Sequence, residues 1–437
     1  MSEIWTNWAG DQRCAPELVE RPGSEEEIVA AVGRARDAGR PLRVAGSGHS
    51  FTDIACTDGH QLHLGRMHAV RRVDTGTGLA EVEAGMRLRE LGPALAEHGR
   101  ALENMGDIDA QAVAGAISTA THGTGARFGN LSVQIEALRL VTAEGEVLEC
   151  SEESDPELFL AARVGLGSLG VISTVTFRTV PLFTLRRVDE GQPLDRVLAE
   201  LDRYADENDH FEFYVFPYAD TALTRSTERS DREPDPVDPR LRYLQDVVLE
   251  NKLMSMAVRT GRAVPSLIPR INNLLTSLVG RSVRFDHSHR VFASKREVPF
   301  TEMEYAVPRE AGAEAVRRVM ELVERRRIPV GFPIEVRFVA ADDAFLSPSN
   351  GRDTCYIAVH MFRGMDFESY FRGVESIMDD YEGRPHWGKR HYQSAATLSE
   401  RYPDWERFAA VRSRLDPGGL FRNDYLDRVL GPLPALV

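Results

Sequence analysis

The stretch Val44-Ala45-Gly46-Ser47-Gly48-His49-Ser50-Phe51 decides how the first half of the chain is interpreted. It places two glycines, a histidine and a serine directly after Arg43–Ala45, which predicts the end of a buried strand. Glycine allows positive φ and a close approach of backbone N–H groups to a ligand, so such a turn can cradle an anionic phosphate. A tight turn with a hydrogen-bonded histidine explains the same residues, and the stretch alone leaves both hypotheses open.

The residues on both sides of this turn predict an α+β fold. Residues 51–56 are polar and broken rather than helical, which argues against the strand–glycine–helix unit of a Rossmann fold. A capping box, with Ser24 as N-cap and Glu27 reaching back, begins a helix that Gly39 ends. Further along, the pattern predicts strands at 62–64, 70–73 and 79–84 and a helix with Leu88, Leu91 and Leu95 on one face. Such alternation of helices and strands is typical of covered sheets.

A second glycine-rich stretch, Asn104–Gly125, consists largely of small residues. Small side chains permit a close approach to another helix or to a flat ligand, and tight helix packing is the simpler explanation. The closing segment Thr121–Gly125 favours a ligand, because it forms a second polar, glycine-rich turn. By contrast, Gly165–Gly170 matches the letters of the GxGxxG dinucleotide fingerprint but follows a predicted helix and precedes a strand, the reverse of the required order.

The composition indicates a globular protein with room for two or three domains: 437 residues, of which 42% are hydrophobic and 27% charged. A net charge of −14 disfavours nucleic acid and anionic membrane as main partners. No apolar run reaches the roughly 18 residues that span a bilayer. Four cysteines without a CxxC pair suggest neither a metal site nor a disulfide framework. Residues 1–5 lack a signal-peptide pattern, so we expect a cytoplasmic protein.

Beyond Pro181 the pattern predicts an antiparallel sheet backed on one face by helices. The expected strands are 211–216, 300–305, 334–338 and 356–360, and the expected helices are 194–204, 311–324 and 367–378. Residues 230–239 predict an acidic surface loop, and residues 252–278 predict helical pieces packed on this part rather than a membrane anchor. We therefore place a domain boundary near residue 180.

Two clusters in the second part carry the charged groups best suited to chemistry. Glu335 and Arg337 lie on one face of a predicted strand, and their apolar neighbours indicate a buried or interfacial pair rather than the solvated pair that this spacing usually forms. The segment Arg384-Pro385-His386-Trp387-Gly388-Lys389 combines a proline, an aromatic ring and cationic groups in a loop. It is either an exposed basic loop or a ligand wall, and the tryptophan and glycine favour the wall.

Together these stretches resemble the aldonolactone oxidase and dehydrogenase branch of the vanillyl-alcohol-oxidase flavoproteins, which includes L-gulonolactone, D-arabinonolactone and alditol oxidases. The matching segments are Asn7–Gly10, Arg21–Ser24, Gly46–Phe51, Asn104–Gly125, Glu335–Arg337, His386–Lys389, Leu415–Pro417 and Phe421–Asn423. The resemblance covers nearly the whole chain. It implies an α+β fold with a two-subdomain FAD-binding domain at 1–180, an antiparallel cap domain at 181–395 and a C-terminal segment, 396–437, that returns to the FAD-binding domain.

The resemblance also implies how FAD is held. Gly46, Ser47, Gly48, His49 and Ser50 would wrap the pyrophosphate, and His49 would be joined covalently to the flavin, which requires a neutral imidazole nitrogen. Gly106 occupies the position whose bulk gates oxygen access in this family, and Asp107 replaces the serine of the alditol oxidases, which favours a lactone as substrate. The other FAD-binding residues would be Gly115, Ser118, Thr121, His122, Gly123, Gly125, Val171, Ile172 and His386, together with Gly106 and Asp107.

The implied reaction is oxidation of a sugar-acid 1,4-lactone, of the L-gulono or D-arabinono type, at its C2 hydroxyl with hydride transfer to the flavin. Arg337 would stabilise the developing alkoxide, Glu335 would orient or accept from the hydroxyls, and Lys389 would hold the substrate or offset the charge of the reduced flavin. Oxidation of an alditol or other polyol and a non-catalytic sugar-acid-binding flavoprotein are the alternatives. The electron acceptor would be oxygen, a quinone or a cytochrome.

Overall fold

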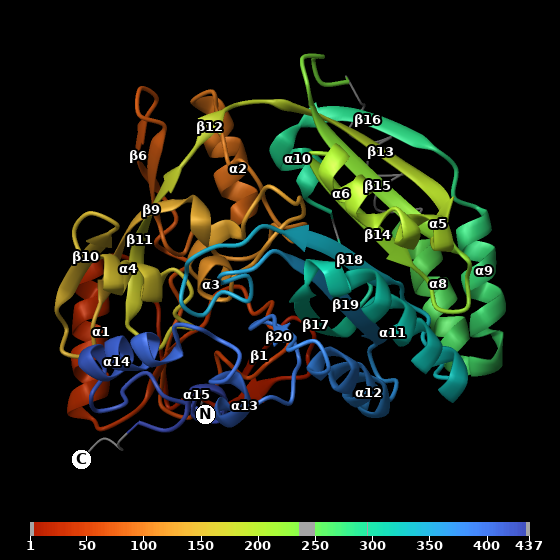
Figure 1. Cartoon of the computed structure of the whole chain (residues 1–437). Coiled ribbons are helices and arrows are strands. Elements are labelled where there is room, and N and C mark those ends of the chain that lie inside the picture. Colours follow the sequence, from red (N-terminus) through yellow and green to blue (C-terminus); the bar gives the residue numbers. More distant parts are fainter. Residues whose placement is uncertain (1–3, 236–249, 295, 434–437) are drawn as a thin grey trace.

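The computed structural model describes residues 4–235, 250–294 and 296–433. Two sheet-based parts lie side by side, and the chain passes from the first to the second between residues 181 and 184 (Figure 1). The expected α+β class is confirmed, while the bounds of the three predicted segments stay a prediction. Among the described residues, no helix is both long and apolar enough to cross a lipid bilayer.

The first part contains short strands and four α-helices. Its strands are β1 (Trp5–Thr6), β2 (Arg13–Cys14), β3 (Leu18–Glu20), β4 (Leu42–Val44), β5 (His60–Leu62), β6 (Val70–Asp74), β7 (Leu79–Glu83), β8 (Arg100–Ala101), β9 (Ile135–Val141), β10 (Val147–Ser151), β11 (Val171–Arg178) and β12 (Val180–Pro181). Its helices are α1 (Glu25–Asp37), α2 (Leu88–Glu97), α3 (Val113–Ser118), the 3₁₀ turn η1 (Leu131–Gln134) and α4 (Pro156–Ala162).

These strands form two main sheets. A three-stranded parallel sheet has the order β3-β5-β4, and a five-stranded antiparallel sheet has the order β10-β9-β11-β7-β6. Helix α1 buries Ile28, Ala31, Val32 and Ala35 in the shared core. Its N-cap Ser24 accepts from the Glu27 N–H at 3.2 Å as predicted, but the Glu27 carboxylate accepts from the Gly23 N–H at 2.7 Å rather than from Ser24 itself.

The second part is one eight-stranded antiparallel sheet in the order β16-β13-β15-β14-β18-β19-β17-β20. Its strands are β13 (Thr184–Pro193), β14 (His210–Val215), β15 (Thr221–Ser230), β16 (Ser282–His287), β17 (Phe300–Pro308), β18 (Ile334–Val339), β19 (Thr354–Phe362) and β20 (Arg384–Pro385). Its helices are α5 (Leu194–Ala199), α6 (Leu201–Glu207), α8 (Glu250–Ala263), α9 (Ile268–Ser277), α10 (Ser288–Phe292), α11 (Gly312–Arg326) and α12 (Glu368–Asp379), with 3₁₀ turns η3 (Pro265–Leu267) and η4 (Arg309–Ala311).

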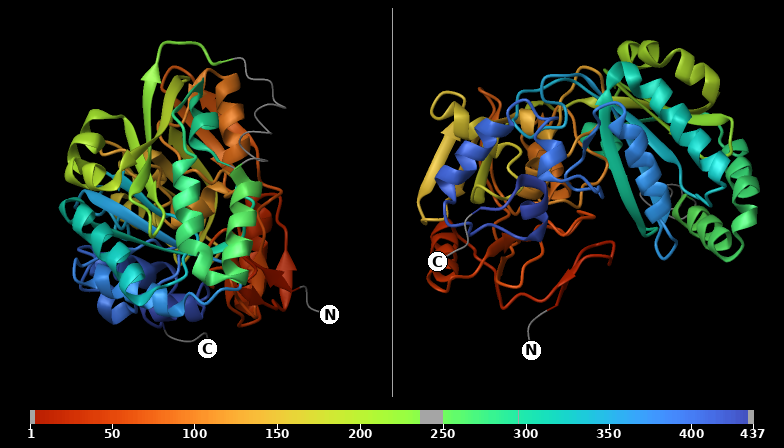
Figure 2. Two further views of the ribbon diagram at one scale, coloured as in Figure 1. Left: turned by 90° about the vertical axis from the view of Figure 1, so that its right-hand side faces the viewer. Right: turned by 60° about the horizontal axis from the view of Figure 1, so that its bottom comes forward.

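The two faces of this sheet differ, because side chains alternate along each strand. Phe211, Phe213 and Val336 belong to the apolar face, which packs against α11 and α12 (Figure 2). Their neighbours Glu212 and Glu335 therefore lie on the opposite, polar face. The predicted sheet backed on one face by helices is thus confirmed, and the polar face is where the candidate site forms.

The structure corrects one sequence expectation for this part and confirms another. The predicted helix 194–204 is two helices, α5 and α6, because Glu200 has φ −110° and ψ 22° and interrupts the helical backbone. The predicted helical pieces at 252–278 are confirmed as α8, η3 and α9. Residues 236–239 of the predicted acidic loop lie outside the described residues.

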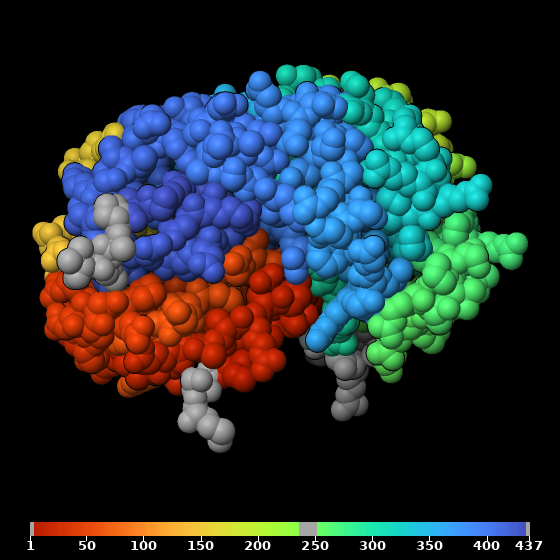
Figure 3. Space-filling model, turned by 90° about the horizontal axis from the view of Figure 1, so that it is seen from below, coloured from red at the N-terminus to blue at the C-terminus, as the bar shows by residue number. Residues whose placement is uncertain are grey.

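The C-terminal helices α13 (Ala395–Leu398), α14 (Trp405–Leu415) and α15 (Asp424–Leu430) pack on the first part of the chain. Seen from below, this segment (blue) lies directly against the N-terminal segment (red) (Figure 3). The Leu42 N–H donates to the Leu420 carbonyl at 2.7 Å, which fixes strand β4 to the C-terminal segment. The turn that follows β4 is therefore supported by residues from the far end of the chain.

Candidate functional site

The turn after β4 presents a row of unused backbone donors. In the part of the chain that the structure describes, the N–H groups of Gly46, Ser47, Gly48, His49 and Ser50 donate to no protein acceptor. The amides on either side are used: Ala45 N–H donates to Leu62 at 2.9 Å, and Phe51 N–H donates to Gly388 at 2.7 Å. Gly48 has φ +71°, which turns the backbone at the centre of the row. Such a row of free donors fits the phosphate groups of a dinucleotide.

A buried arginine that the sequence reasoning missed holds this turn in place. Arg43, on β4, donates to the carbonyls of Ile54, Gly167, Phe421 and Leu166 at 2.7–2.9 Å. Burial lowers the pKa of Arg43 to about 10, and it stays charged near neutral pH. The signal was present as one arginine inside an apolar strand next to the glycines, but its carbonyl partners lie in three separate segments that the sequence does not connect.

His49 lies in the same turn with its ring stacked on Trp8, the ring centroids 5.6 Å apart and the planes inclined by 23°. Burial, together with the nearby Lys389 ammonium, lowers the pKa of His49 to about 4. Within the described residues, neither ring nitrogen has a hydrogen-bond partner. His49 is therefore a neutral imidazole with an available nitrogen at neutral pH, the state that attack on an electrophilic carbon requires.

The second glycine-rich stretch folds back on itself at van der Waals distance. A Cβ atom at Gly123 would lie 2.5 Å from the Asn104 side-chain oxygen and 2.5 Å from the Met105 carbonyl. A Cβ atom at Gly106 would lie 3.0 Å from the His122 carbonyl oxygen. The small residues here thus allow two backbone segments to lie side by side, rather than two helices, so the packing hypothesis accounts for part of the pattern.

The other residues predicted to bind a cofactor form two groups. The first group lies near Gly106 and β18, and the second lies within the first part of the chain. Thr121 lies beside Gly106, and the Gly125 N–H donates to the Phe338 carbonyl at 2.8 Å, which fixes the stretch to β18. Ser118 ends α3, where its carbonyl accepts from the Leu166 N–H, while Gly115 is exposed on α3. The side chains of Val171 and Ile172 belong to the hydrophobic core of the first part, within the five-stranded sheet.

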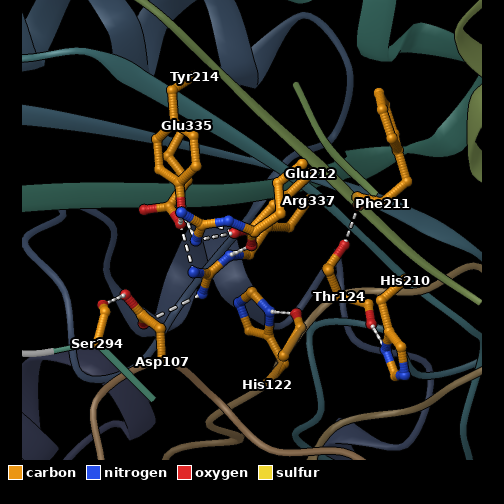
Figure 4. A network of polar contacts seen from close by, with 12 residues as sticks. Asp107, His122, Thr124, His210, Phe211, Glu212, Tyr214, Ser294, Glu335 and Arg337 are labelled. Carbon is orange, nitrogen blue, oxygen red and sulfur yellow. Dashed lines mark hydrogen bonds and ion pairs between the residues drawn. The ribbon is translucent and has the colours of Figure 1, made fainter. Parts of the chain in front are cut away.

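Arg337 is the centre of a buried cluster of charges on the polar face of the second sheet (Figure 4). It forms an ion pair with Glu335, two residues away on β18. Its Nε lies 2.9 Å from the Glu212 carboxylate on β14, and a terminal nitrogen lies 3.4 Å from the Asp107 carboxylate. Both Glu335 and Arg337 are only 6% exposed. The predicted buried pair therefore exists and extends to Asp107 of the glycine-rich stretch.

Further groups complete this cluster. The Tyr214 hydroxyl lies 2.9 Å from the carboxylates of Glu212 and Glu335, Arg225 lies 2.8 Å from Glu212, and Arg296 lies 2.9 Å from Asp107. A cavity of about 30 Å³ lies beside Arg337 and Asp107, lined also by Met105, Gly123, Thr124, His210 and Phe292. It has room for roughly one water molecule or hydroxyl group.

The guanidinium groups decide which carboxyls of the cluster are ionised. Burial raises the pKa of Asp107, but Arg337 and Arg296 outweigh burial and hold that pKa well below its usual value. Burial also raises the pKa of Glu335. Arg337 lowers this pKa by less than burial raises it, so the pKa of Glu335 stays above its usual value. Burial lowers the pKa of Arg337, yet the surrounding carboxylates outweigh it and raise the pKa. A permanent cation thus lies beside a carboxyl that takes up a proton easily.

A second buried cluster surrounds Lys389, and the sequence reasoning missed its carboxylates. Glu302 and Glu304 lie on the polar face of β17, next to each other by alternation. Glu302 forms an ion pair with Lys389 and lies 3.4 Å from His360 Nε2, while Glu304 lies 3.2 Å from His122 Nε2. The signal was a pair of glutamates in an otherwise apolar strand, the same signal that identified Glu335 and Arg337.

His122, Glu304 and His386 each place one ligand atom within 4.8 Å of the others, a spacing that a metal ion could use. The hydrogen bonds argue against such use. Nδ1 of His386 accepts from the Gly388 N–H at 3.0 Å, and burial lowers the pKa of His386 to about 3. The neutral ring therefore carries its proton on Nε2, which makes that atom a donor rather than a ligand. We interpret the three residues as a hydrogen-bonded cluster.

The structure contradicts the exposed-loop interpretation of the segment around His386, and it contradicts the predicted part of Trp387 in a ligand wall. Trp387 is fully buried in the core and donates its indole N–H to the Leu346 carbonyl at 2.6 Å, so it forms no ligand wall. Arg384 is buried and donates to the carbonyls of Arg401, Pro348 and Asn350, so the loop is not an exposed basic one. The reason is pairing of β20 with β17, which draws the segment into the sheet.

Comparison with known proteins places this site in context. A sequence profile described as D-arabinono-1,4-lactone oxidase matches residues 175–429, and one described as FAD binding domain matches residues 16–151. The L-gulono-1,4-lactone dehydrogenase of Mycobacterium tuberculosis strain H37Rv is 58% identical over 432 residues, 99% of this chain and all of that protein. The L-gulonolactone oxidase of Bos taurus is 37% identical over 97% of both chains.

More distant relatives also match this chain over nearly its whole length. The alditol oxidase of a Streptomyces species is 32% identical over 98% of this chain and all of that protein. A solvent-stable cholesterol oxidase shares the fold, with a TM-score of 0.83 at 17% identity over 99% of this chain and 98% of that chain. These matches extend over almost every residue, and the chain belongs to the D-arabinono-1,4-lactone oxidase family of FAD-binding oxidoreductases.

Proposed function

We propose that this protein uses FAD to oxidise a sugar-acid 1,4-lactone, of the L-gulono or D-arabinono type, at its C2 hydroxyl. One observation carries the proposal: Arg337 contacts Asp107 at 3.4 Å. This contact joins the glycine-rich stretch of the FAD-binding part to the charged face of the second sheet, so the cofactor-binding and charge-stabilising groups share one site. Relatives named for L-gulono-1,4-lactone and L-gulonolactone support the same substrate class.

The cofactor proposal rests on the free amides of residues 46–50 and on His49. When bound, FAD supplies a ring that accepts a hydride from carbon. These five N–H donors, which have no acceptor among the described residues, suit its pyrophosphate. The neutral His49, with no hydrogen-bond partner in the described chain, suits covalent attachment. Gly106, Thr121, Gly123, Gly125 and the donor Nε2 of His386 would contact the cofactor, as would Gly115, Ser118, His122, Val171 and Ile172.

Three side chains would act on the substrate. Arg337 is a permanent cation whose planar group can donate to the C2 oxygen as negative charge develops there. Glu335 takes up a proton more readily than an ordinary glutamate, which suits a group that accepts the hydroxyl proton. Lys389 would bind the lactone oxygens or offset negative charge on the cofactor. Asp107 contacts one terminal nitrogen of Arg337 at 3.4 Å and so helps to hold the guanidinium in place for the substrate.

An alditol or polyol is the second candidate substrate, because an alditol oxidase is 32% identical over nearly the whole chain. Asp107 favours the lactone. We leave oxygen, a quinone and a cytochrome as candidate electron acceptors, since the relatives include both dehydrogenases and oxidases. A cytoplasmic location is part of the proposal, in keeping with four free thiols.

The test is anaerobic mixing of the purified, flavin-loaded protein with candidate substrates. L-gulono-1,4-lactone or D-arabinono-1,4-lactone should bleach the flavin absorbance near 450 nm within seconds (on the order of the usual enzyme turnover). Bleaching by xylitol or sorbitol but by neither lactone would establish the polyol alternative. No bleaching by either class would leave a sugar-acid-binding flavoprotein without catalysis and overturn the proposal.

A further inference from the structure

Strand β17 holds the Lys389 segment by both its backbone and its side chains. The His386 N–H donates to the Glu304 carbonyl at 3.0 Å, and the Arg390 N–H donates to the Glu302 carbonyl at 2.9 Å. The Glu302 carboxylate then forms an ion pair with the Lys389 ammonium. Glu302 is 4% exposed, so it keeps this position only if a cation accompanies it.

Lysine is rare in this chain compared with arginine. Of its 53 basic residues only Lys252, Lys295 and Lys389 are lysines, and every other one is an arginine. Arginine remains charged in any protein site, whereas a lysine can lose its proton when it is buried without a counterion. The charge on Lys389 therefore depends on its neighbours in a way that the charge on Arg337 does not.

The groups that face Lys389 come from four parts of the fold. Glu302 and Glu304 lie on β17, Asp107 lies on the glycine-rich stretch, His49 lies in the turn after β4, and His386 lies on the segment of Lys389 itself. The ammonium also lies 5.3 Å from the centroid of the Phe51 ring. Burial lowers the pKa of Lys389, and Glu302 is the largest of the effects that raise it.

We infer that Glu302 is a positioning residue: it fixes Lys389 in the site and keeps it charged. The geometry supports this, because one oxygen of the Glu302 carboxylate pairs with the Lys389 ammonium and the other lies 3.4 Å from Nε2 of His360. The His360 ring is itself anchored to the backbone, since its Nδ1 donates to the Pro333 carbonyl at 3.0 Å, so Glu302 lies between this ring and the ammonium. The inference rests on the proposed function only for the role of Lys389 in catalysis.

The direct test measures the protonation of Lys389 without substrate. Competitive labelling of the flavin-loaded protein with acetic anhydride between pH 7 and 11, read by peptide mass spectrometry, gives the pKa of each lysine, with exposed Lys252 as internal reference. In the wild type, Lys389 should titrate above the usual pKa of a lysine. In Glu302→Gln it should titrate at least one pH unit lower than in the wild type, which raises its labelling rate at pH 8 about tenfold.

Two variants complete the comparison. Glu302→Asp keeps the charge and should retain most of the wild-type pKa of Lys389. Glu375→Gln neutralises another buried glutamate, on helix α12, which accepts from the Tyr305 hydroxyl and the Tyr392 N–H, and it should leave Lys389 unchanged. An unchanged Lys389 titration in a folded Glu302→Gln protein, or an equal shift in Glu375→Gln, overturns the inference.

Kinetics give an independent readout. The rate of flavin bleaching by lactone should acquire an alkaline limb at lower pH in Glu302→Gln, and adding Lys389→Met to that variant should abolish this limb, because Lys389 is the group that titrates. An alkaline limb that stays at the wild-type pH in Glu302→Gln, or that survives the added Lys389→Met, contradicts the inference. Failure of the wild type to bleach with any lactone refutes the proposed function and leaves the labelling result to decide the role of Glu302.

Discussion

Removing the Arg337 guanidinium should destabilise the protein more than removing any surface cation. Arg337→Leu leaves Glu212, Glu335 and Asp107 without the cation they share, and all three are largely buried. Breaking a buried ion pair from one side costs about 3–5 kcal/mol of unfolding free energy. A typical domain has only about 5–15 kcal/mol in total. The variant should therefore fold with a much smaller margin, and its flavin reduction by lactone should slow by roughly 100-fold or more.

The loss of unfolding free energy in Arg337→Leu should depend on pH and be larger at neutral than at acidic pH. In the wild type the pKa of Asp107 is lowered, so its contribution to stability is present above its unfolded pKa and is lost as pH falls. Without Arg337, burial raises the pKa of Glu335 further, so this carboxyl becomes more destabilising as pH rises through that value, whereas Glu212 keeps Arg225 as a partner. The stability difference between wild type and variant should thus be largest near pH 7.5 and shrink towards pH 5.

Urea unfolding of the flavin-loaded proteins, followed by tryptophan fluorescence at pH 7.5 and 5, measures this difference. Arg407→Leu is the matched control, because Arg407 pairs with Glu157 at the surface and should cost at most about 1 kcal/mol. If Arg337→Leu does not fold, Arg337→Lys keeps the charge without the planar fork and should give an intermediate loss. A loss in Arg337→Leu no larger than in Arg407→Leu, or one that grows towards pH 5, refutes the reasoning.

Three further outcomes are expected. Acid-precipitated wild-type protein should stay yellow and His49→Ala should release free FAD, whereas a colourless wild-type pellet would exclude the covalent bond. Glu335→Gln should slow flavin reduction roughly 100-fold with normal flavin content, and a near wild-type rate would make the pair structural. Gly106→Ala should slow reoxidation of the reduced flavin by oxygen in stopped-flow mixing and spare its reduction by lactone. The reason is that the added methyl group would lie 3.0 Å from the His122 carbonyl oxygen and 3.1 Å from the Thr121 methyl. Wild-type reoxidation over minutes would identify a dehydrogenase instead.

The sequence by itself determined the local structure and the residues with chemistry inside single elements. Apolar periodicity predicted helix α2 and strand β18, and alternation along β18 placed Glu335 and Arg337 on one buried face. The order of helix and strand around Gly165–Gly170 correctly excluded a dinucleotide fingerprint there. These predictions succeeded because the spacing of side chains along a helix or strand is a property of neighbouring residues alone.

Only the tertiary structure decided which distant residues meet. Arg337 forms an ion pair with Glu212 because β14 pairs with β18. Lys389 forms an ion pair with Glu302 because the segment of Lys389 pairs with β17. Trp387 became a core residue for the same reason. Strand order in a sheet depends on the packing of the whole chain, which local spacing does not encode. The sequence therefore predicted which side chains could carry chemistry, and the fold decided which partners set their charge and position.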